Sequence, residues 1–318
     1  MSPYSATILS VLEAAAGYVP RSFALAAGRG LGNLSSFLVR SRRKQVLANL
    51  ELAYGMEMNH LQRRRLMHQV FRHFGRALVE EVLMPQMVAH GLDRYVDYEG
   101  WENLEQSVAG GKGAIIFTGH FGNWELIALA QGARGIPMDV VGRPPDSLEV
   151  ARRLDRLRKL TGNRTISKRH AVRPMLQSLR EGRTVGLVID QNVGAGRGVF
   201  VNFFGHQAST TPALAVLALK TGVPVLPVFS YPNGTRYQVV YRRPLQFHPS
   251  GRRQEDILSL TQEATKVIEE EIRLRPHLWL WMHNRWRSRP ENEMNPPLAS
   301  SPEAPEPIKN AASGERPT

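Results

Sequence analysis

The sequence predicts an α/β fold in which a mostly parallel sheet is covered by helices on both faces. Between residues 113 and 275, short apolar segments alternate with amphipathic segments of helical period. Two of the helical segments end at a glycine, Gly182 and Gly222, and the next apolar segment begins directly afterwards. Strands that alternate with helices in this way pair in parallel, because each helix carries the chain back to the same edge of the sheet.

The expected elements follow in chain order. A helix is expected over residues 58–90, with apolar residues at helical spacing: Leu61, Leu66, Val70, Phe74, Leu78 and Val79. Strands are expected at residues 113–118, 138–142, 184–189, 199–205, 223–229 and 235–242. Helices are expected at residues 123–133, 147–160, 172–182 and 211–222. A last amphipathic helix is expected over residues 254–275, with one apolar face: Ile257, Leu260, Ala264, Val267, Ile268 and Ile272.

The composition favours anionic partners. Of the 318 residues, 41 are Lys or Arg and 28 are Asp or Glu, which gives a formal charge of +13. Nucleic acid, anionic lipid headgroups and an acidic carrier protein all fit such a balance. The chain contains no cysteine, so disulfides, thiolate metal sites and a cysteine nucleophile are excluded.

The N-terminal segment is rich in apolar residues but is interrupted. Glu13, Pro20, Arg21 and Arg29 divide residues 6–39, so no clean stretch of about 20 apolar residues is present to span a membrane. No basic stretch precedes the apolar part, which argues against a secretory signal. Amphipathic helices on an anionic membrane surface fit better, with the basic stretch "RSRRK" next to them. An ordinary helical cap on the core is the alternative.

A histidine and a glutamate stand at a glycine-rich corner, "TGHFGNWEL", between an expected strand and an expected helix. His120 lies just past the strand's carboxyl end, where ligands bind in parallel sheets, and Glu125 lies in the first turn of the helix. Across this junction the carboxylate could hold the imidazole in one tautomer, so that His120 acts as a general base. Backbone N–H groups near Gly119–Asn123 would then stabilise an oxyanion. A histidine that caps the helix, with Glu125 favouring its dipole, is the alternative.

Two other function classes fit less well. A nucleotide-binding oxidoreductase is suggested by "VGAGRG", but its glycines lack the G-x-G-x-x-G spacing and a strand rather than a helix is expected to follow. A nucleic-acid-binding protein is suggested by the charge alone. The chain shows neither a recognisable nucleic-acid-binding module nor one concentrated basic stripe, so no nucleic-acid partner is expected.

Several segments resemble one enzyme family. "HFGNWE" is similar to the H-x4-D/E block of the glycerolipid-type acyltransferases. The wider match is to the bacterial lipid A biosynthesis acyltransferases, the lauroyl and myristoyl transferases. It rests on three further segments in the same order along the chain: "RRKQVLANLELAYG", "IDQNVGAGRGVFVNFFGHQASTTPALAVLALKTGVPVLPV" and "EEEIRLRPHLWLWMHNRWRSRP". The resemblance covers residues 6–290 and implies the glycerolipid acyltransferase-like fold.

The resemblance also implies an activity and site residues. The activity is transfer of an acyl group from acyl-carrier protein to a hydroxyl of a glycolipid such as a lipid A precursor, without metal or other cofactor. His120 matches the catalytic histidine and Glu125 its acidic partner. Arg143 matches the family's arginine after the next strand and is expected to contact an anion of the substrate. Asp190 and Gln191 match the family's D-Q pair, which would shape the site or bind the acceptor; a turn-capping aspartate is the alternative for Asp190. Gly119 and Asn123 are added to these from the corner itself, and Arg285, Trp286 and Arg287 are weaker candidates. Related enzymes acylate phosphatidylinositol mannosides from acyl-CoA, so donor and acceptor stay open.

Three regions are expected in the chain. Residues 1–45 form a membrane-associated helical segment, residues 46–290 the α/β acyltransferase domain, and residues 291–318 a disordered tail rich in proline. The expected location is the cytoplasmic face of the inner membrane, with the protein attached as a peripheral or monotopic enzyme.

Overall fold

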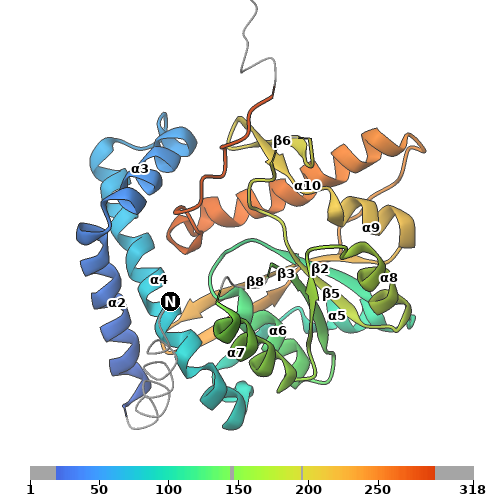
Figure 1. Ribbon diagram of the computed structural model, residues 1–318, viewed down its shortest axis with the longest axis horizontal. Coiled ribbons are helices and arrows are strands. Elements are labelled where there is room, and N and C mark those ends of the chain that lie inside the picture. Colours follow the sequence, from blue (N-terminus) through green and yellow to red (C-terminus); the bar gives the residue numbers. More distant parts are fainter. Residues whose placement is uncertain (1–18, 144–146, 195, 291–318) are drawn as a thin grey trace, which may run out of the picture.

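The computed structural model describes residues 19–143, 147–194 and 196–290, and Figure 1 shows the arrangement of its helices and strands. Expectations for residues 1–18 and 291–318 lie outside the described residues. Within the described ranges, seven strands form the central sheet, in the order β1-β9-β8-β2-β5-β3-β4. Neighbouring strands pair in parallel except β8 and β9, so the predicted mixed α/β fold with a mostly parallel sheet is confirmed.

The elements agree with most of the sequence-based expectations. The strands of the central sheet are β1 Val96–Glu99, β2 Ala114–Thr118, β3 Met138–Gly142, β4 Arg164–Ser167, β5 Thr184–Val188, β8 Val225–Asn233 and β9 Arg236–Tyr241. A separate antiparallel hairpin consists of β6 Val199–Phe203 and β7 His206–Thr210. The helices are α2 Arg21–Leu38, α3 Arg40–Tyr54, α4 His60–Ala89, α5 Trp101–Val108, α6 Trp124–Ala133, α7 Leu148–Lys159, α8 Val172–Arg180, α9 Ala213–Thr221 and α10 Arg253–Leu274. Two 3-10 turns, η1 Leu92–Arg94 and η2 Pro276–Leu278, complete them.

Helices cover both faces of the sheet because successive residues of a strand point to opposite faces. In β2, Ile115 and Phe117 pack into one hydrophobic cluster with residues of α8, α9 and α10. Ala114 and Ile116 pack into a second cluster with residues of α5, α6 and α7. This two-sided burial explains why β2 is an uninterrupted apolar run rather than an alternating one.

The helix expected over residues 58–90 is α4, but its regularly spaced apolar residues do not share one buried face. Leu66 and Val70 are buried, whereas Leu61 and Leu78 are 56% and 69% exposed. Helical spacing alone cannot fix which side of a long helix is covered, because α4 is contacted by α2 on one side and by the sheet domain on another.

Helix α2 lies along the outer side of α4 (Figure 1). Glycines form the contact: a Cβ atom added to Gly32 would lie 2.2 Å from the Phe71 carbonyl oxygen, and one added to Gly75 would lie 2.3 Å from the Gly28 carbonyl oxygen. The two backbones therefore approach as closely as glycine permits. Residue 45, where the N-terminal segment was expected to end, lies inside α3, so this segment continues into the α/β part without a break.

The opposite side of α2 carries exposed apolar side chains. Phe23, Leu31 and Leu38 are 70%, 63% and 70% exposed, and Leu34 lies on the same side. Among the described residues, no helix combines the length and hydropathy needed to cross a bilayer.

Candidate active site

The register of two neighbouring strands brings His120 and Asp190 together. Thr118 at the end of β2 is paired in parallel with Val188 at the end of β5, and the Ile189 N–H donates to the Thr118 carbonyl. His120 and Asp190 are each two residues beyond this pair. They therefore leave the same edge of the sheet side by side, although they are 70 positions apart in the sequence.

The Asp190 carboxylate accepts three hydrogen bonds. Its Oδ1 lies 2.7 Å from Nδ1 of His120, and its Oδ2 accepts from the His120 backbone N–H at 2.7 Å and from the Trp279 Nε1–H at 2.6 Å. The side chain of Asp190 is 2% exposed and that of His120 is 19% exposed. A carboxylate can only accept, so Nδ1 carries the proton and the lone pair of the neutral ring lies on Nε2.

The charge of Asp190 is maintained although the side chain is buried. Burial alone would raise the pKa of this carboxyl, but the facing His120 imidazole and the hydrogen bonds from His120 and Trp279 outweigh it. The pKa of Asp190 therefore lies below its ordinary value. An ionised carboxylate fixes the imidazole orientation and stabilises its protonated form, which is what a histidine base requires.

The second ring nitrogen of His120 faces Gln191. The Gln191 Nε2 lies 3.1 Å from the His120 Nε2, with the amide placed so that its N–H donates to the ring lone pair. The Trp124 ring lies edge-on to the imidazole, with ring centroids 4.9 Å apart. The Gln191 amide therefore occupies the hydrogen-bonding position at Nε2.

The loop from Gly119 to Asn123 is held by its own backbone amides. The N–H of His120 donates to Asp190, that of Phe121 to the Gly119 carbonyl, and that of Gly122 to the Leu278 carbonyl. The N–H of Asn123 donates to the Ser230 hydroxyl, which donates in turn to the Asn123 carbonyl. The sequence-based expectation that these amides bind an oxyanion is wrong for His120 to Asn123, because each already has a partner.

The two loop residues expected to contact substrate, Gly119 and Asn123, contact the protein instead, and so does Gly122 between them. A Cβ atom at Gly122, where φ is +59°, would lie 1.9 Å from the Ser230 carbonyl oxygen. A Cβ atom at Gly119 would lie 3.0 Å from the Asp190 Oδ2, so this glycine lets Asp190 approach. Asn123 is buried, and its side chain caps α6 by accepting from the Leu126 N–H.

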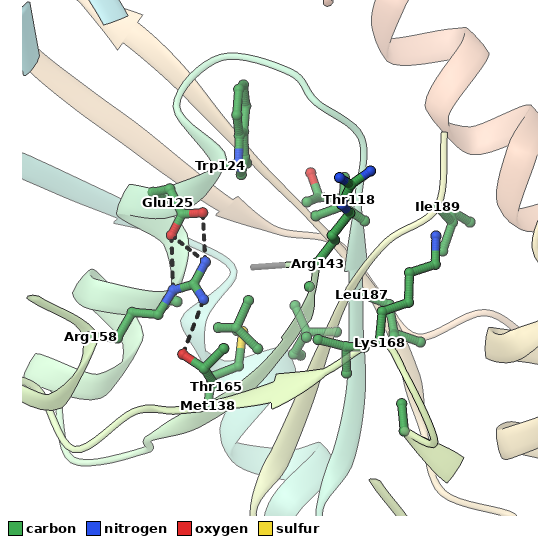
Figure 2. A pocket seen from close by; sticks show the side chains of 18 of the residues that line it. Thr118, Trp124, Glu125, Met138, Arg143, Arg158, Thr165, Lys168, Leu187 and Ile189 are labelled. Carbon is green, nitrogen blue, oxygen red and sulfur yellow. Dashed lines mark hydrogen bonds and ion pairs between the residues drawn. The ribbon is translucent and has the colours of Figure 1, made fainter. Parts of the chain in front are cut away.

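Glu125 does not contact the imidazole as expected. Its carboxylate binds the Arg158 guanidinium of α7 through both oxygens, at 2.7 to 3.1 Å, and Arg158 also donates to the Thr165 hydroxyl (Figure 2). Both side chains are largely buried, at 11% and 7% exposed. The five-residue spacing from His120 carries Glu125 around the first turn of α6 toward α7, away from the imidazole.

A cavity of about 830 Å³ opens beside His120 at the carboxyl edge of the sheet. Its lining includes apolar residues such as Ile116, Ile127, Met138, Met175 and Leu187. Its lining also includes polar and charged groups: His120, Glu125, Arg143, Arg152, Arg158, Lys168 and Gln191. Figure 2 shows the ion pair of Glu125 with Arg158 on one side of this space and Arg143 and Lys168 on the other.

The remaining sequence candidates fall into two groups. Arg143 and Gln191 line the cavity, whereas Gly119, Asn123 and Asp190 lie outside its lining. Arg285 is fully buried and donates to the Ser209 carbonyl and the Thr210 hydroxyl, so it supports the end of β7 rather than an exposed surface. Within the described ranges, no three His, Asp or Glu side chains converge in the way a metal site requires.

Sequence comparison matches residues 6–288 to the family described as bacterial lipid A biosynthesis acyltransferase. The chain belongs to this family. It is 28% identical over 271 residues to the lipid A biosynthesis lauroyltransferase of Escherichia coli (strain K12), which covers 83% of this chain and 85% of the relative. It is 25% identical to the palmitoleoyltransferase (84% and 85%) and 22% identical to the myristoyltransferase (84% and 81%) of the same strain.

Membership of the lipid A biosynthesis acyltransferases confirms the family resemblance read from the sequence and makes the chain an O-acyltransferase. The site geometry fits such an enzyme, because His120, whose imidazole is bonded to a buried carboxylate, lines a cavity that also has many apolar residues in its lining. An apolar cavity suits a fatty acyl chain, and an imidazole held by a carboxylate suits an acceptor hydroxyl that must lose its proton.

Proposed function

We propose that this enzyme transfers a fatty acyl group from acyl-carrier protein to a hydroxyl of a lipid A precursor, a glycolipid of the Kdo2-lipid IVA type. The observation that carries the proposal is the bond between His120 and the buried Asp190 at the edge of an apolar cavity. The family match and the names of the lauroyl, palmitoleoyl and myristoyl transferases support this class of acceptor.

In the proposed reaction, His120 is the general base. Its Nε2 takes the proton of the acceptor hydroxyl while the hydroxyl oxygen attacks the thioester carbonyl carbon. The carbon–sulfur bond then breaks, and the imidazolium returns the proton to the leaving thiolate. Asp190 stabilises the imidazolium, in place of the role first assigned to Glu125. These steps use only groups of the chain and its two substrates.

The oxyanion of the tetrahedral intermediate is proposed to meet side chains rather than loop amides. The amides of His120 to Asn123 are already bonded within the protein, whereas Gln191 and Arg143 line the cavity. The Gln191 amide lies beside the His120 Nε2, and its N–H would donate to the developing charge once the acceptor hydroxyl has replaced it there. Arg143 adds a positive charge at the same edge of the sheet.

Glu125 is proposed to act through Arg158. Their bidentate ion pair ties the first turn of α6 to α7 across the side of the cavity. Because α6 begins directly after the His120 loop, this pair keeps the wall of the acyl cavity in register with the base. Glu125 is thus a positioning residue in the proposal, with no contact to reacting atoms.

The outer side of α2 is proposed to lie on the cytoplasmic surface of the inner membrane. Its exposed apolar side chains are followed in the sequence by the basic residues Arg40, Arg42, Arg43 and Lys44. Apolar side chains next to cations suit the boundary between acyl chains and anionic headgroups. Residues 1–45 would then form the membrane-associated segment and residues 46–290 the catalytic domain.

A transfer assay read by mass spectrometry tests the proposal. Purified enzyme in detergent receives acyl-carrier-protein and acyl-CoA donors of several chain lengths, and the acceptors are a Kdo-bearing lipid A precursor and a phosphatidylinositol mannoside. The expected result is one added acyl mass on the lipid A precursor, lost in His120→Ala. If only the mannoside is acylated, the proposed acceptor is wrong and a phosphatidylinositol mannoside takes its place. If neither acceptor is acylated, the proposed activity is rejected.

A further inference from the structure

Two cations leave the sheet side by side at the mouth of the cavity. Gly142 at the end of β3 is paired in parallel with Ser167 at the end of β4, and the Lys168 N–H donates to the Gly142 carbonyl at 2.9 Å. Arg143 directly follows β3 and Lys168 directly follows β4, so their backbones are neighbours at the spacing of paired strands. Both side chains point the same way from the strand ends (Figure 2).

Both carboxylates that line the cavity already have cationic partners. Glu125 is engaged by Arg158, and Asp155 is engaged by Lys159 at 2.8 Å. Arg152 of α7 also lines the cavity, and within the described residues neither Arg152 nor Lys168 forms an ion pair. Adjacent cations repel one another, and a bound anion removes that repulsion.

The loop that carries Lys168 closes toward the cavity. His170 adopts a left-handed backbone conformation, with φ of +58°, which is uncommon for a residue other than glycine. The turn directs His170, Ala171 and Val172 to the cavity lining, so the amino-terminal end of α8 also faces it. A helix amino terminus favours negative charge, which adds to the effect of the three basic side chains.

We propose that Arg143, Arg152 and Lys168 form a binding site for a phosphate ester at the mouth of the acyl cavity. The inference rests on the proposed acyl transfer and names what is recognised there. Arg and Lys side chains are suited to phosphate oxygens through charge-assisted hydrogen bonds. The phosphate has two possible sources of the same chemistry: the phosphorylated sugar of the glycolipid acceptor, or the phosphopantetheine arm of the donor.

The test removes the phosphate and the cation separately and together. KM is measured for wild type and Lys168→Met in two series. The acceptor series compares a phosphorylated acceptor with the same acceptor after phosphatase treatment. The donor series compares acyl-phosphopantetheine with acyl-pantetheine. Lys112→Met is the matched control, because Lys112 is exposed in the turn before β2, at the opposite edge of the sheet. For the wild-type enzyme, KM is expected to rise about tenfold when the recognised phosphate is removed from the substrate.

The effect of the substitution on KM with and without phosphate decides whether the phosphate site exists and which substrate supplies the phosphate. Lys168→Met is expected to raise KM about tenfold for the phosphorylated substrate and to leave KM unchanged for its dephosphorylated form. That pattern in the acceptor series assigns the glycolipid phosphate, and in the donor series it assigns the phosphopantetheine phosphate. If Lys168→Met has the same effect with and without phosphate in both series, the site is rejected.

A binding measurement separates this inference from the transfer activity. Inorganic phosphate is titrated by calorimetry into wild type, Lys168→Met, Arg152→Met and Lys112→Met. The expected result is weaker binding in Lys168→Met and Arg152→Met, and binding equal to wild type in Lys112→Met. Equal affinity in all four proteins overturns the phosphate site even if acyl transfer occurs. Absence of transfer with selective loss of phosphate binding would instead reject the proposed activity alone.

Discussion

Asp190 and Glu125 lie beside the same cavity, but their carboxylates face different partners. Asp190 follows β5 and contacts the imidazole, a backbone N–H and an indole N–H. Glu125 lies on α6 and contacts the guanidinium of Arg158. One carboxylate therefore contacts an imidazole, which can take up and release a proton, and the other contacts a guanidinium, which keeps its charge. Only the first can support a proton transfer.

The largest effect is expected from removing the base. His120→Ala should lower kcat by about 10²–10⁴-fold, because general-base assistance and the contact with Asp190 are both lost. Turnover with acyl-carrier-protein donor is the measurement, and added imidazole should restore part of the rate. Turnover close to that of wild type would show that His120, and with it the pair of His120 and Asp190, does not take part in the reaction.

Exchanging the two carboxylates for amides compares them directly. Asp190→Asn should lower kcat by about 10²-fold and move the acid limb of the pH–rate profile to lower pH, since the imidazolium loses its carboxylate. Glu125→Gln should leave that limb in place and instead lower the free energy of unfolding by about 1–3 kcal/mol, because Arg158 loses one of its two carboxylate acceptors and its ionic partner and keeps only the amide oxygen and the Thr165 hydroxyl. A shifted acid limb in Glu125→Gln would reverse the two assignments.

A smaller effect is expected from the support of the His120 loop. His73 of α4 is buried, and its Nε2 bonds the Gly122 carbonyl at 3.2 Å. Burial lowers the pKa of His73 to about 3, against an ordinary value near 6.5. The folded state thus excludes a proton that the unfolded chain binds, and stability should fall as the pH drops from 6.5 toward 3. At pH 5 the loss is about 2 kcal/mol relative to pH 7.

Thermal unfolding at pH 7 and pH 5 measures this contribution. His73→Gln keeps a donor for the Gly122 carbonyl but does not titrate, so its unfolding temperature should depend less on pH than that of wild type. His248→Gln, at an exposed position, is the matched control and should behave as wild type. An unchanged pH dependence in His73→Gln would contradict the buried neutral state.

The smallest effect is expected far from both carboxylates. Leu34→Ser on the outer side of α2 should lower binding to vesicles of anionic lipid about fivefold, since about 1 kcal/mol of apolar transfer is lost. Leu258→Ser, at an exposed position of α10, should leave vesicle binding unchanged. Sedimentation with vesicles provides the comparison, and kcat in detergent should stay at the wild-type value for both variants. Equal binding by Leu34→Ser and wild type would count against the membrane face.

The alternation of strands and helices from β2 to α10 and the position of His120 after β2 could be predicted from the sequence. Both depend on local signals, namely the spacing of apolar residues and the place where a strand ends. The sequence-based prediction assigned the wrong partner to the imidazole because the H-x4-E spacing is local, whereas the contact with Asp190 depends on the pairing of β2 with β5. A usable signal was present: His120 and Asp190 each stand two residues past a strand end. The strand order, and with it the proximity of Arg143 to Lys168, comes from long-range pairing that periodicity does not encode.

The glycine contact between α2 and α4 has a consequence for regioselectivity. At Gly28, Gly32 and Gly75 the two helices meet through their backbones, so main-chain contacts rather than flexible side chains set the position of α2 on α4. On a bilayer, the height of His120 above the lipid surface would then be set by main-chain geometry. Substitutions on the outer side of α2 would change how long the enzyme stays on the surface, whereas bulkier residues at the three glycines would change which hydroxyl of the glycolipid the imidazole reaches.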